Sequence, residues 1–213
     1  MKIKWLGHAA FVISSIKGMK IFTDPYAPDE RLSYGEINEP ADIVTVSHDH
    51  SDHNNVVAVS GNPEIVREAS DVKGIKFDSV LVSHDDAQGK ERGSNTIFCF
   101  DIDEIRICHL GDLGHKLSEN QIAQVGKVDV LLIPVGGFYT IDAATATRVC
   151  NQTKPKIIIP MHFKNSKCDF PISGVDEFLK GKPNVRQLDT SEVEFQAREL
   201  PDNTEIIVLK SAL

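Results

Sequence analysis

Short apolar runs separated by turns make up most of the first half of the chain. The runs are rich in Val, Ile and Phe, a composition that favours β-strands. Turn signals stand between them, for example Lys17-Gly18 and the polar segment Asp101–Glu104. The opening residues, Met1–Leu6, alternate in the manner of a strand. The other predicted strands of this half are Ala10–Ser14, Lys20–Thr23, Ile43–Val46, Val80–Val82, Thr96–Phe100 and Ile105–Cys108.

In the second half, strands alternate with helices. A helix is predicted to begin at Ser118, because Gln121 stands three residues later and completes a capping-box pattern. No low-complexity linker or fixed-period repeat divides the chain, so we expect residues 1–213 to form a single α/β domain. The remaining elements expected here are helices from about Asp142 to Asn151 and from about Ser173 to Lys180, and strands Val130–Ile133, Lys156–Pro160 and Glu205–Leu209.

Composition narrows the class of protein. Of the 213 residues, 41% are hydrophobic and 25% are charged, which is enough apolar material for one sizeable core. The formal net charge of −8 repels nucleic acids and anionic lipids at long range, so neither is an expected partner. The four cysteines show no C-x-x-C spacing, which disfavours a zinc ribbon or a redox pair. Without a signal peptide or an apolar run of roughly 20 residues, we expect a cytoplasmic protein with free thiols.

Side chains that can bind metal stand where the apolar runs end. Residues at strand ends can converge on one edge of a sheet, where a rigid scaffold positions chemistry. This pattern carries more weight than any single histidine. The residues that follow five of the predicted strands are Asp24, His48, His84, His109 with Asp112, and His162.

The run His48-Asp49-His50-Ser51-Asp52-His53 concentrates ligand-type side chains in one short segment. A tight loop after a strand can direct its first two histidines to one ion and Asp52 with His53 to a neighbouring ion. Imidazole and carboxylate groups suit borderline divalent metals such as zinc. The competing interpretation is a solvated polar loop, but H-x-H-x-D-H directly after a strand favours a metal site.

The segment Ser47–His53 resembles the signature of the metallo-β-lactamase fold superfamily. Two further segments, Trp5–Phe11 and Phe22–Pro25, resemble the branch that contains ascorbate-phosphate lactonase and many uncharacterised metal-dependent hydrolases. The resemblance runs from about Lys2 to His162 and is specific for the superfamily rather than for a substrate. It implies an αββα four-layer sandwich with a dinuclear metal site at one edge of the two sheets.

The resemblance also implies a ligand set for two divalent ions. One ion would be held by His48, His50 and His84, and the other by Asp52, His53 and His162. Asp112 matches a carboxylate that bridges the two ions, and Asp24 matches a supporting aspartate that orients a ligand. On sequence alone, His84 could instead be a surface loop residue and Asp112 a turn residue between glycines.

Three further histidines keep two interpretations each. His8 lies in one of the resembling segments, so we expect it to line the pocket, although a structural histidine at a β-turn fits equally. His109 and His115 flank Asp112, and either one could contact substrate, donate a proton or serve the fold. Arg92 and Lys164 are candidates for holding a phosphate or carboxylate, with solvated loop residues as the competing interpretation.

These residues permit a defined chemistry. A divalent metal lowers the pKa of bound water to roughly 7, which gives a hydroxide at neutral pH. Asp112 would receive the proton from that water, while the ion held by Asp52, His53 and His162 would stabilise the developing oxyanion. Zinc suits the donors best, and manganese, iron, cobalt and nickel are compatible with them.

The expected function is hydrolysis of a small ester, lactone or related bond in a small-molecule substrate, for example a sugar acid or its phosphate. The alternatives are a phosphodiesterase and a non-catalytic metal-binding or sensing protein. Aspartate at position 112 and histidine at position 50 differ from the cysteine of antibiotic-hydrolysing lactamases and the glutamate of the oxygen-reducing di-iron branch. The short acidic chain also disfavours an RNA-cleaving enzyme. A homo-oligomer is expected only because the resemblance implies it.

Overall fold

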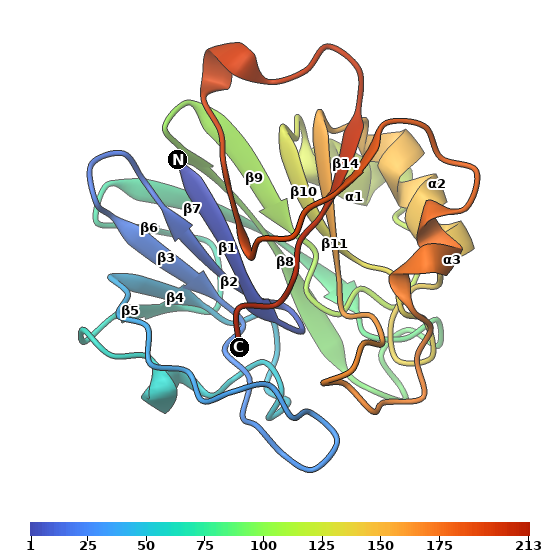
Figure 1. Ribbon diagram of the computed structural model, residues 1–213, viewed down its shortest axis with the longest axis horizontal. Helices are drawn as coiled ribbons and strands as arrows, with labels where there is room; N and C mark the ends of the chain where they lie inside the picture. Colours follow the sequence, from blue (N-terminus) through green and yellow to red (C-terminus); the bar gives the residue numbers. More distant parts are fainter.

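Two β-sheets face each other across the core of the protein (Figure 1). The computed structural model describes all residues, 1–213. The six-stranded sheet has the order β13 (Glu192–Glu194), β1 (Lys2–Gly7), β2 (Ala10–Ser14), β3 (Lys20–Thr23), β4 (Ile43–Thr45) and β5 (Glu64–Val66). The eight-stranded sheet has the order β12 (Val185–Gln187), β14 (Glu205–Val208), β11 (Ile157–Met161), β10 (Val130–Pro134), β9 (Ile105–His109), β8 (Ser94–Ile102), β7 (Ile75–Ser83) and β6 (Ser70–Val72).

The pairing directions make many strands of each sheet end at the same edge. In the first sheet, β3, β4 and β5 are parallel, and β1 has the same direction because β2 is antiparallel to both β1 and β3. In the second sheet, β9, β10, β11, β14 and β12 are parallel. Because β8 is antiparallel to both β7 and β9, β7 also points toward that edge.

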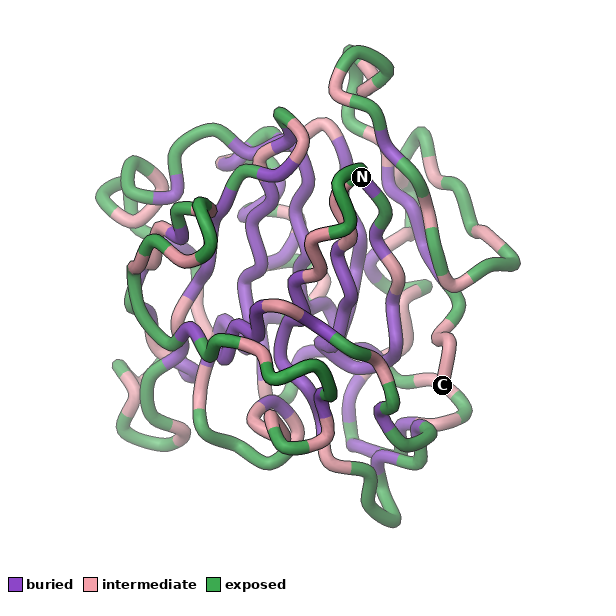
Figure 2. Tube along the Cα trace, turned by 90° about the vertical axis from the view of Figure 1, so that its left-hand side faces the viewer, coloured by how far each residue is buried: buried purple, intermediate pink, exposed green.

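The alternation of side chains along the strands builds two hydrophobic clusters. In β2, Phe11 and Ile13 face the larger cluster of 45 buried residues between the sheets, while Ala10 and Val12 face a smaller cluster of 15 residues on the other side. This is the two-residue period of a strand. Figure 2 shows the same arrangement, with buried residues concentrated in the strands and exposed residues in the connections. Both faces of the first sheet are therefore covered.

The helices pack on the eight-stranded sheet. They are α1 (Glu119–Val125), α2 (Ala143–Thr153) and α3 (Val175–Leu179), and none is long and apolar enough to cross a membrane. Ser118 forms the predicted capping box with Gln121 at the start of α1. The outer face of the six-stranded sheet is instead covered by extended segments and the 3₁₀ turn Val56–Ala58, through residues such as Tyr26, Leu32 and Phe170. The expected αββα class is confirmed, with one outer layer built mainly from loops.

The differences from the predicted elements follow from exposure and length. Strands β5, β6, β12 and β13 were not predicted, because each has three residues and mostly polar or exposed positions. Strands β7 and β8 extend well beyond the predicted segments, since their polar residues pair along the whole hairpin. Helix α2 continues to Thr153 and ends at Lys154, which has φ 48° and precedes Pro155.

The core predicts a contrast between two leucines of the same sheet. Leu131 in β10 is fully buried, whereas Leu81 in β7 is 71% exposed. Leu131→Ala should lower the free energy of unfolding by about 2–5 kcal/mol, because it leaves a cavity in the shared core. Leu81→Ala should change it by roughly 0.5 kcal/mol or less. Urea denaturation of both variants measures this, and equal losses would contradict the assigned core.

Candidate metal centre

The carboxyl ends of strands from both sheets carry the candidate site residues to one edge of the sandwich. Each of these residues follows its strand within a few positions, as the sequence pattern predicts. His8 follows β1, Asp24 follows β3, the run His48–His53 follows β4, His84 follows β7, Asp112 follows β9 and His162 follows β11.

Three of these residues have an unusual backbone conformation. His8 has φ 52°, Asp24 has φ 41° and His162 has φ 51°, all in the left-handed region. All three are buried. The N–H of His162 also donates to the carbonyl of His8 at 3.2 Å, which joins the two sheets directly. Backbone conformations that side chains disfavour persist where the surrounding structure holds them, and such positions cluster at functional sites.

The first candidate ligand group consists of His48, His50 and His84. One ring nitrogen from each lies within 4.8 Å of the others, which is close enough to share an ion. Nε2 of His48 is 3.1 Å from Nδ1 of His50. The resemblance had assigned these same three histidines to one ion, and the structure brings them together.

The second group consists of Asp52, His53 and His162, and His8 joins it. Nε2 of His8 lies 3.1 Å from Oδ2 of Asp52, and its ring centroid is 4.0 Å from that of His162. Burial and the neighbouring His162 lower the pKa of His8 to about 4. Since neutral imidazole can donate one N–H, His8 is placed to orient the Asp52 carboxylate.

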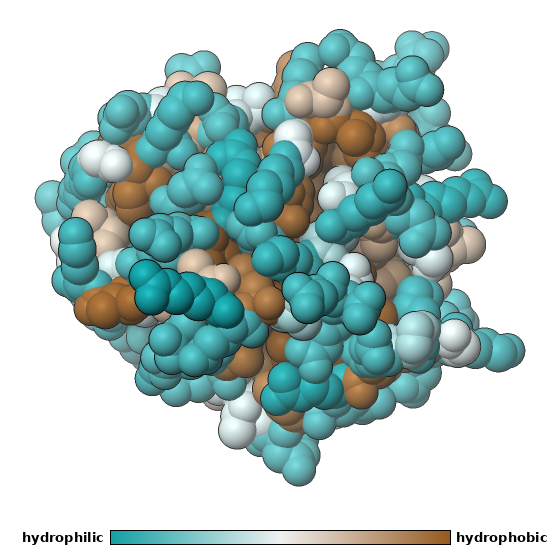
Figure 3. Space-filling model, turned by 90° about the horizontal axis from the view of Figure 1, so that it is seen from above, coloured by the Kyte–Doolittle hydropathy of each residue, from teal (hydrophilic) through white to brown (hydrophobic).

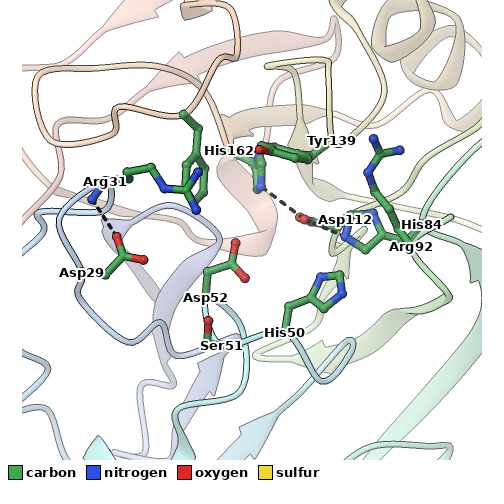
Figure 4. A pocket seen from close by; sticks show the side chains of 11 residues that line it. Asp29, Arg31, His50, Ser51, Asp52, His84, Arg92, Asp112, Tyr139 and His162 are labelled. Carbon is green, nitrogen blue, oxygen red and sulfur yellow. Dashed lines mark hydrogen bonds and ion pairs between the residues drawn. The ribbon is translucent and has the colours of Figure 1, made fainter.

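Asp112 lies between the two groups and contacts both. Its Oδ1 is 3.3 Å from Nε2 of His53, and its Oδ2 is 3.3 Å from Nε2 of His84 and 3.2 Å from Nε2 of His162. Figure 4 shows this carboxylate between the His84 and His162 rings. Burial disfavours its charge, but His162 and His53 outweigh that effect and hold its pKa well below the usual value.

The unpaired atoms of the site fit a divalent metal. Nε2 of His53 and Oδ1 of Asp112 are buried and form no hydrogen bond, although they lie 3.3 Å from each other. Burial opposes protonation of His53, yet Asp112 and Asp52 outweigh it and raise its pKa well above the usual value. Positive charge is therefore favoured at this point, and imidazole and carboxylate donors together suit zinc and similar ions.

Asp24 supports the candidate ligand His53 through a contact with its second ring nitrogen. Its Oδ2 lies 2.9 Å from Nδ1 of His53 and accepts a 2.5 Å hydrogen bond from Oγ of Ser47. Its Oδ1 accepts the backbone N–H of Ser47 at 2.8 Å. A carboxylate that binds the second nitrogen of a histidine fixes the tautomer and orientation of the ring. The resemblance implied this supporting position for Asp24.

Asn95 and Gly111 also shape the site, although sequence reasoning did not single them out. The buried Asn95 side chain donates to the carbonyl of Leu110 at 2.8 Å and accepts the N–H of Asp112 at 2.9 Å. A Cβ on Gly111 would lie 2.3 Å from Oδ1 of Asn95 and 2.6 Å from Cβ of Ser47, so no larger residue fits there. The available signal for Asn95 was its position directly before the predicted strand Thr96–Phe100, which in the structure begins at Ser94 and so includes Asn95.

Two residues proposed from the sequence as substrate contacts do not line the pocket. His115 accepts the N–H of Ser83 at 3.1 Å and donates to the carbonyl of Lys116 at 2.9 Å, so both of its nitrogens serve the backbone. Lys164 pairs with Asp169 at 3.1 Å. The expected substrate contacts of His115 and Lys164 are therefore corrected to local structural roles.

His109 has a structural role, which was one of the two roles that the sequence left open for it, the other being contact with substrate or proton donation. Its Nε2 donates to the carbonyl of Ala9 at 2.9 Å, and its Nδ1 accepts the N–H of Gly111 at 3.1 Å. The side chain is fully buried. It therefore ties the β1–β2 turn to the segment that carries Asp112.

A cavity of about 330 Å³ opens over the candidate ligands. Arg92 lines it as expected, whereas His8 lies beneath the ligands and does not. The other lining residues outside the ligand set are Asp29, Arg31, Ser51, Tyr139 and Phe170. Tyr139 belongs to the glycine-containing segment Gly136–Thr140, which the sequence predicts as a loop at the pocket edge, whereas Asp29, Arg31 and Phe170 were not indicated by the sequence.

A wider cavity of about 810 Å³ lies at the opposite edge, near the N-terminus. Figure 3 shows that face, where apolar side chains are visible between polar ones. Its lining includes Ile16, Met19 and Phe195 but no histidine. Although this cavity is larger, it offers no ligand set, and we place the reactive site at the histidine-rich edge.

Comparisons with known proteins identify the family of this chain. Residues 2–162 match the family model described as the beta-lactamase superfamily domain. A UPF0173 metal-dependent hydrolase from Archaeoglobus fulgidus is 30% identical over 196 residues, which cover 76% of this chain and 83% of the relative. Another from Thermoplasma acidophilum is 30% identical with the same coverage of both chains.

A solved structure from Thermotoga maritima is similar to this protein over nearly the whole chain. It is assigned to the zinc-dependent hydrolases of the metallo-β-lactamase superfamily, and it is 37% identical with a TM-score of 0.80. The match covers 98% of this chain and 97% of that one. The fold and the site thus define a metal-dependent hydrolase of the metallo-β-lactamase superfamily. Within it, the chain belongs to the UPF0173 family.

Asn95 predicts a test of how Asp112 is positioned. Asn95→Ala leaves the buried carbonyl of Leu110 and the N–H of Asp112 without partners, so the protein should lose about 1–3 kcal/mol of stability. Metal affinity should also fall about 10–100-fold, as expected when a supporting contact is removed. The control is Asn203→Ala, because the Asn203 side chain is exposed and lies outside the cavity lining. Equal metal affinity in both variants would refute the positioning role.

Proposed function

We propose that this protein uses two divalent metal ions to hydrolyse a small ester, lactone or related bond, with sugar acids and their phosphates as leading substrate candidates. The supporting observation is the Asp112 carboxylate, whose two oxygens lie 3.2–3.3 Å from histidines of both candidate groups. A carboxylate in that position suits a bridge between two ions. When bound, the ions would supply an activated water and positive charge beside the substrate oxygen.

The residues would divide the work by position. His48, His50 and His84 would hold one ion, and Asp52, His53 and His162 the other. Asp112 would contact both and receive the proton released by the attacking water. Asp52, Asp112 and His162 line the cavity, so they would lie beside the reacting bond. His8 and Asp24 would orient Asp52 and His53 through the contacts described above.

Zinc is the metal we propose first. The donors are imidazole nitrogens and carboxylate oxygens, and neither candidate group contains a cysteine. Such a set also accepts manganese, iron, cobalt or nickel. A cytoplasmic location stays part of the proposal, since the four buried cysteines are free thiols.

Metal content gives the first test. Protein purified without added metal should contain about two equivalents of a divalent ion by elemental analysis. His48→Ala and Asp112→Ala should each lose metal and reduce hydrolysis to background, because they remove one ligand and the proposed bridge respectively. Lys164→Ala, outside the cavity, serves as the control. Two retained equivalents and full activity in Asp112→Ala would overturn the proposal.

A substrate panel separates the proposed reaction from its alternatives. Lactones and small esters should be hydrolysed faster than bis(p-nitrophenyl) phosphate by the metal-loaded protein. The reverse order would favour a phosphodiesterase. If the metal-loaded protein hydrolyses neither class, the metal-binding or sensing function replaces hydrolysis.

A further inference from the structure

Four side chains beside the candidate metal centre form a row that the proposed chemistry does not use. Cζ of Arg31 lies 5.4 Å from the centre of the Phe170 ring, and Cζ of Arg92 lies 5.6 Å from that of Tyr139. The two rings meet edge to face with centroids 5.6 Å apart. The row therefore runs from one arginine to the other through two aromatic rings, and all four residues line the same cavity.

In Figure 4, Arg31 and Arg92 lie on opposite sides of the pocket, with Asp52, His162 and Asp112 between them. We propose that the substrate is a small molecule with an anionic group at each of two ends, each bound by one of these arginines. Its body would lie along Tyr139 and Phe170, above the reacting atoms. This inference rests on the proposed function and names the class of its substrate.

Arg31 and Arg92 lack the close carboxylate partner that three other arginines of the chain have. Arg148 and Arg198 form no ion pair either, but neither lines this cavity. Arg67, Arg106 and Arg186 each have a carboxylate oxygen within 3.3 Å. Arg92 has only the exposed Glu91, at 3.4 Å, and Arg31 forms no ion pair. A guanidinium group that stacks on a ring keeps its N–H donors free for a carboxylate or phosphate, which it can bind through two hydrogen bonds.

The backbone holds Arg31 in place. Its N–H donates to Oδ1 of Asp29 at 2.8 Å, and its carbonyl accepts the N–H of Asp169 at 2.7 Å. The neighbouring Leu32 forms a β-bridge with Cys168. Asp29 also lines the cavity, and its Oδ1 accepts the backbone N–H groups of Arg31 and Leu32. The loop is thus fixed against the segment that supplies Phe170.

The loop that carries Arg92 is held by backbone hydrogen bonds to the buried Asp85. The Asp85 carboxylate accepts four backbone N–H groups of the loop, including that of Arg92 at 2.8 Å and that of Gly89 at 2.7 Å. Burial opposes its charge, but these hydrogen bonds outweigh burial and lower the pKa of Asp85. The loop between His84 and Arg92 therefore has a set shape, and Arg92 has a defined place at the cavity.

Charge supports an anionic substrate even though the protein is acidic overall. The chain carries a formal net charge of −8, so long-range attraction does not draw anions to it. Specific local cations are then needed for an anion to bind. Neutral lactones or esters would accept only weaker hydrogen bonds from two guanidinium groups, whereas carboxylates and phosphates would gain strong charge-assisted hydrogen bonds.

Binding of small dianions to the metal-loaded protein tests this inference without relying on turnover. The probes are malonate, succinate, glutarate and adipate, with the monomethyl ester of each as the single-charge counterpart, measured by calorimetry. 3-Phosphonopropionate beside succinate distinguishes a phosphate-type end from a carboxylate end. The best dianion should bind about tenfold or more tightly than its half-ester.

The variants are Arg31→Met and Arg92→Met, with Arg186→Met as the control because Arg186 lies on β12. Each of the first two should weaken binding of the best dianion about tenfold or more, while metal content and melting temperature stay unchanged. Arg31→Lys and Arg92→Lys should restore part of the affinity, since they keep the charge. The control should bind as the wild type does.

The outcomes separate this inference from the proposed function. Dianions that bind no better than half-esters, or that bind to both methionine variants as tightly as to the wild type, would overturn the inference even if esters are hydrolysed. Arginine-dependent binding of dianions would support it, even if the protein hydrolysed nothing in the substrate panel. In that case the proposed function would fail while the anion site stood.

Discussion

The burial of the Asp112 carboxylate is the constraint on which the rest of the site depends. A buried carboxylate must be matched by opposite charge or by hydrogen bonds, because leaving water is costly. Asp112 is 2% exposed and meets histidines that follow β4, β7 and β11. Those histidines can reach one carboxylate only if strands of both sheets end at the same edge, which the pairing directions ensure. The sandwich topology and the charge cluster therefore depend on each other.

Close backbone contact keeps these strand ends together. A Cβ on Gly114 would lie 2.2 Å from the carbonyl carbon of His84 and from the nitrogen of Asp85. A Cβ on Gly136 would lie 2.3 Å from the carbonyl oxygen of His162. These glycines let the loops after β9 and β10 press against the loops that carry His84 and His162. The ligands are thus supported by close backbone contact as well as by the buried side chains of Asp24 and Asn95, which favours a fixed geometry.

The sequence predicted the ligands well because their signal is local. The run His48–His53 and the strand-end positions of His84, Asp112 and His162 are visible as short patterns, and the structure places all of these residues together. The long strands and the capping box of α1 were also predictable, since apolar alternation and capping are local. The short edge strands were not, because their pairing depends on neighbours distant in the sequence.

The pocket lining was harder to predict for the same reason. Arg31 reaches the cavity because its loop pairs with the segment around Cys168, more than 130 residues away in the chain. His115 and Lys164 stand near the ligands in the sequence, yet their side chains bond to the backbone or to Asp169 instead. Proximity along the chain therefore indicated the ligands, which follow strands, and placed Arg92 correctly at the cavity, but it misplaced His115 and Lys164.

The candidate metal ligands and the loops that line the pocket therefore have different functions in the structure. The candidate ligands are fixed by strand ends and by close-packed glycines. A change in these strand ends or glycines would therefore disturb the framework of the fold. Arg31, Arg92, Tyr139 and Phe170 come from loops that are organised by their own hydrogen bonds, such as those to Asp85. Loops of this kind can change sequence without moving the strands beneath them. In the proposed enzyme, the framework would then determine the reaction, and the loops would determine which molecule undergoes it.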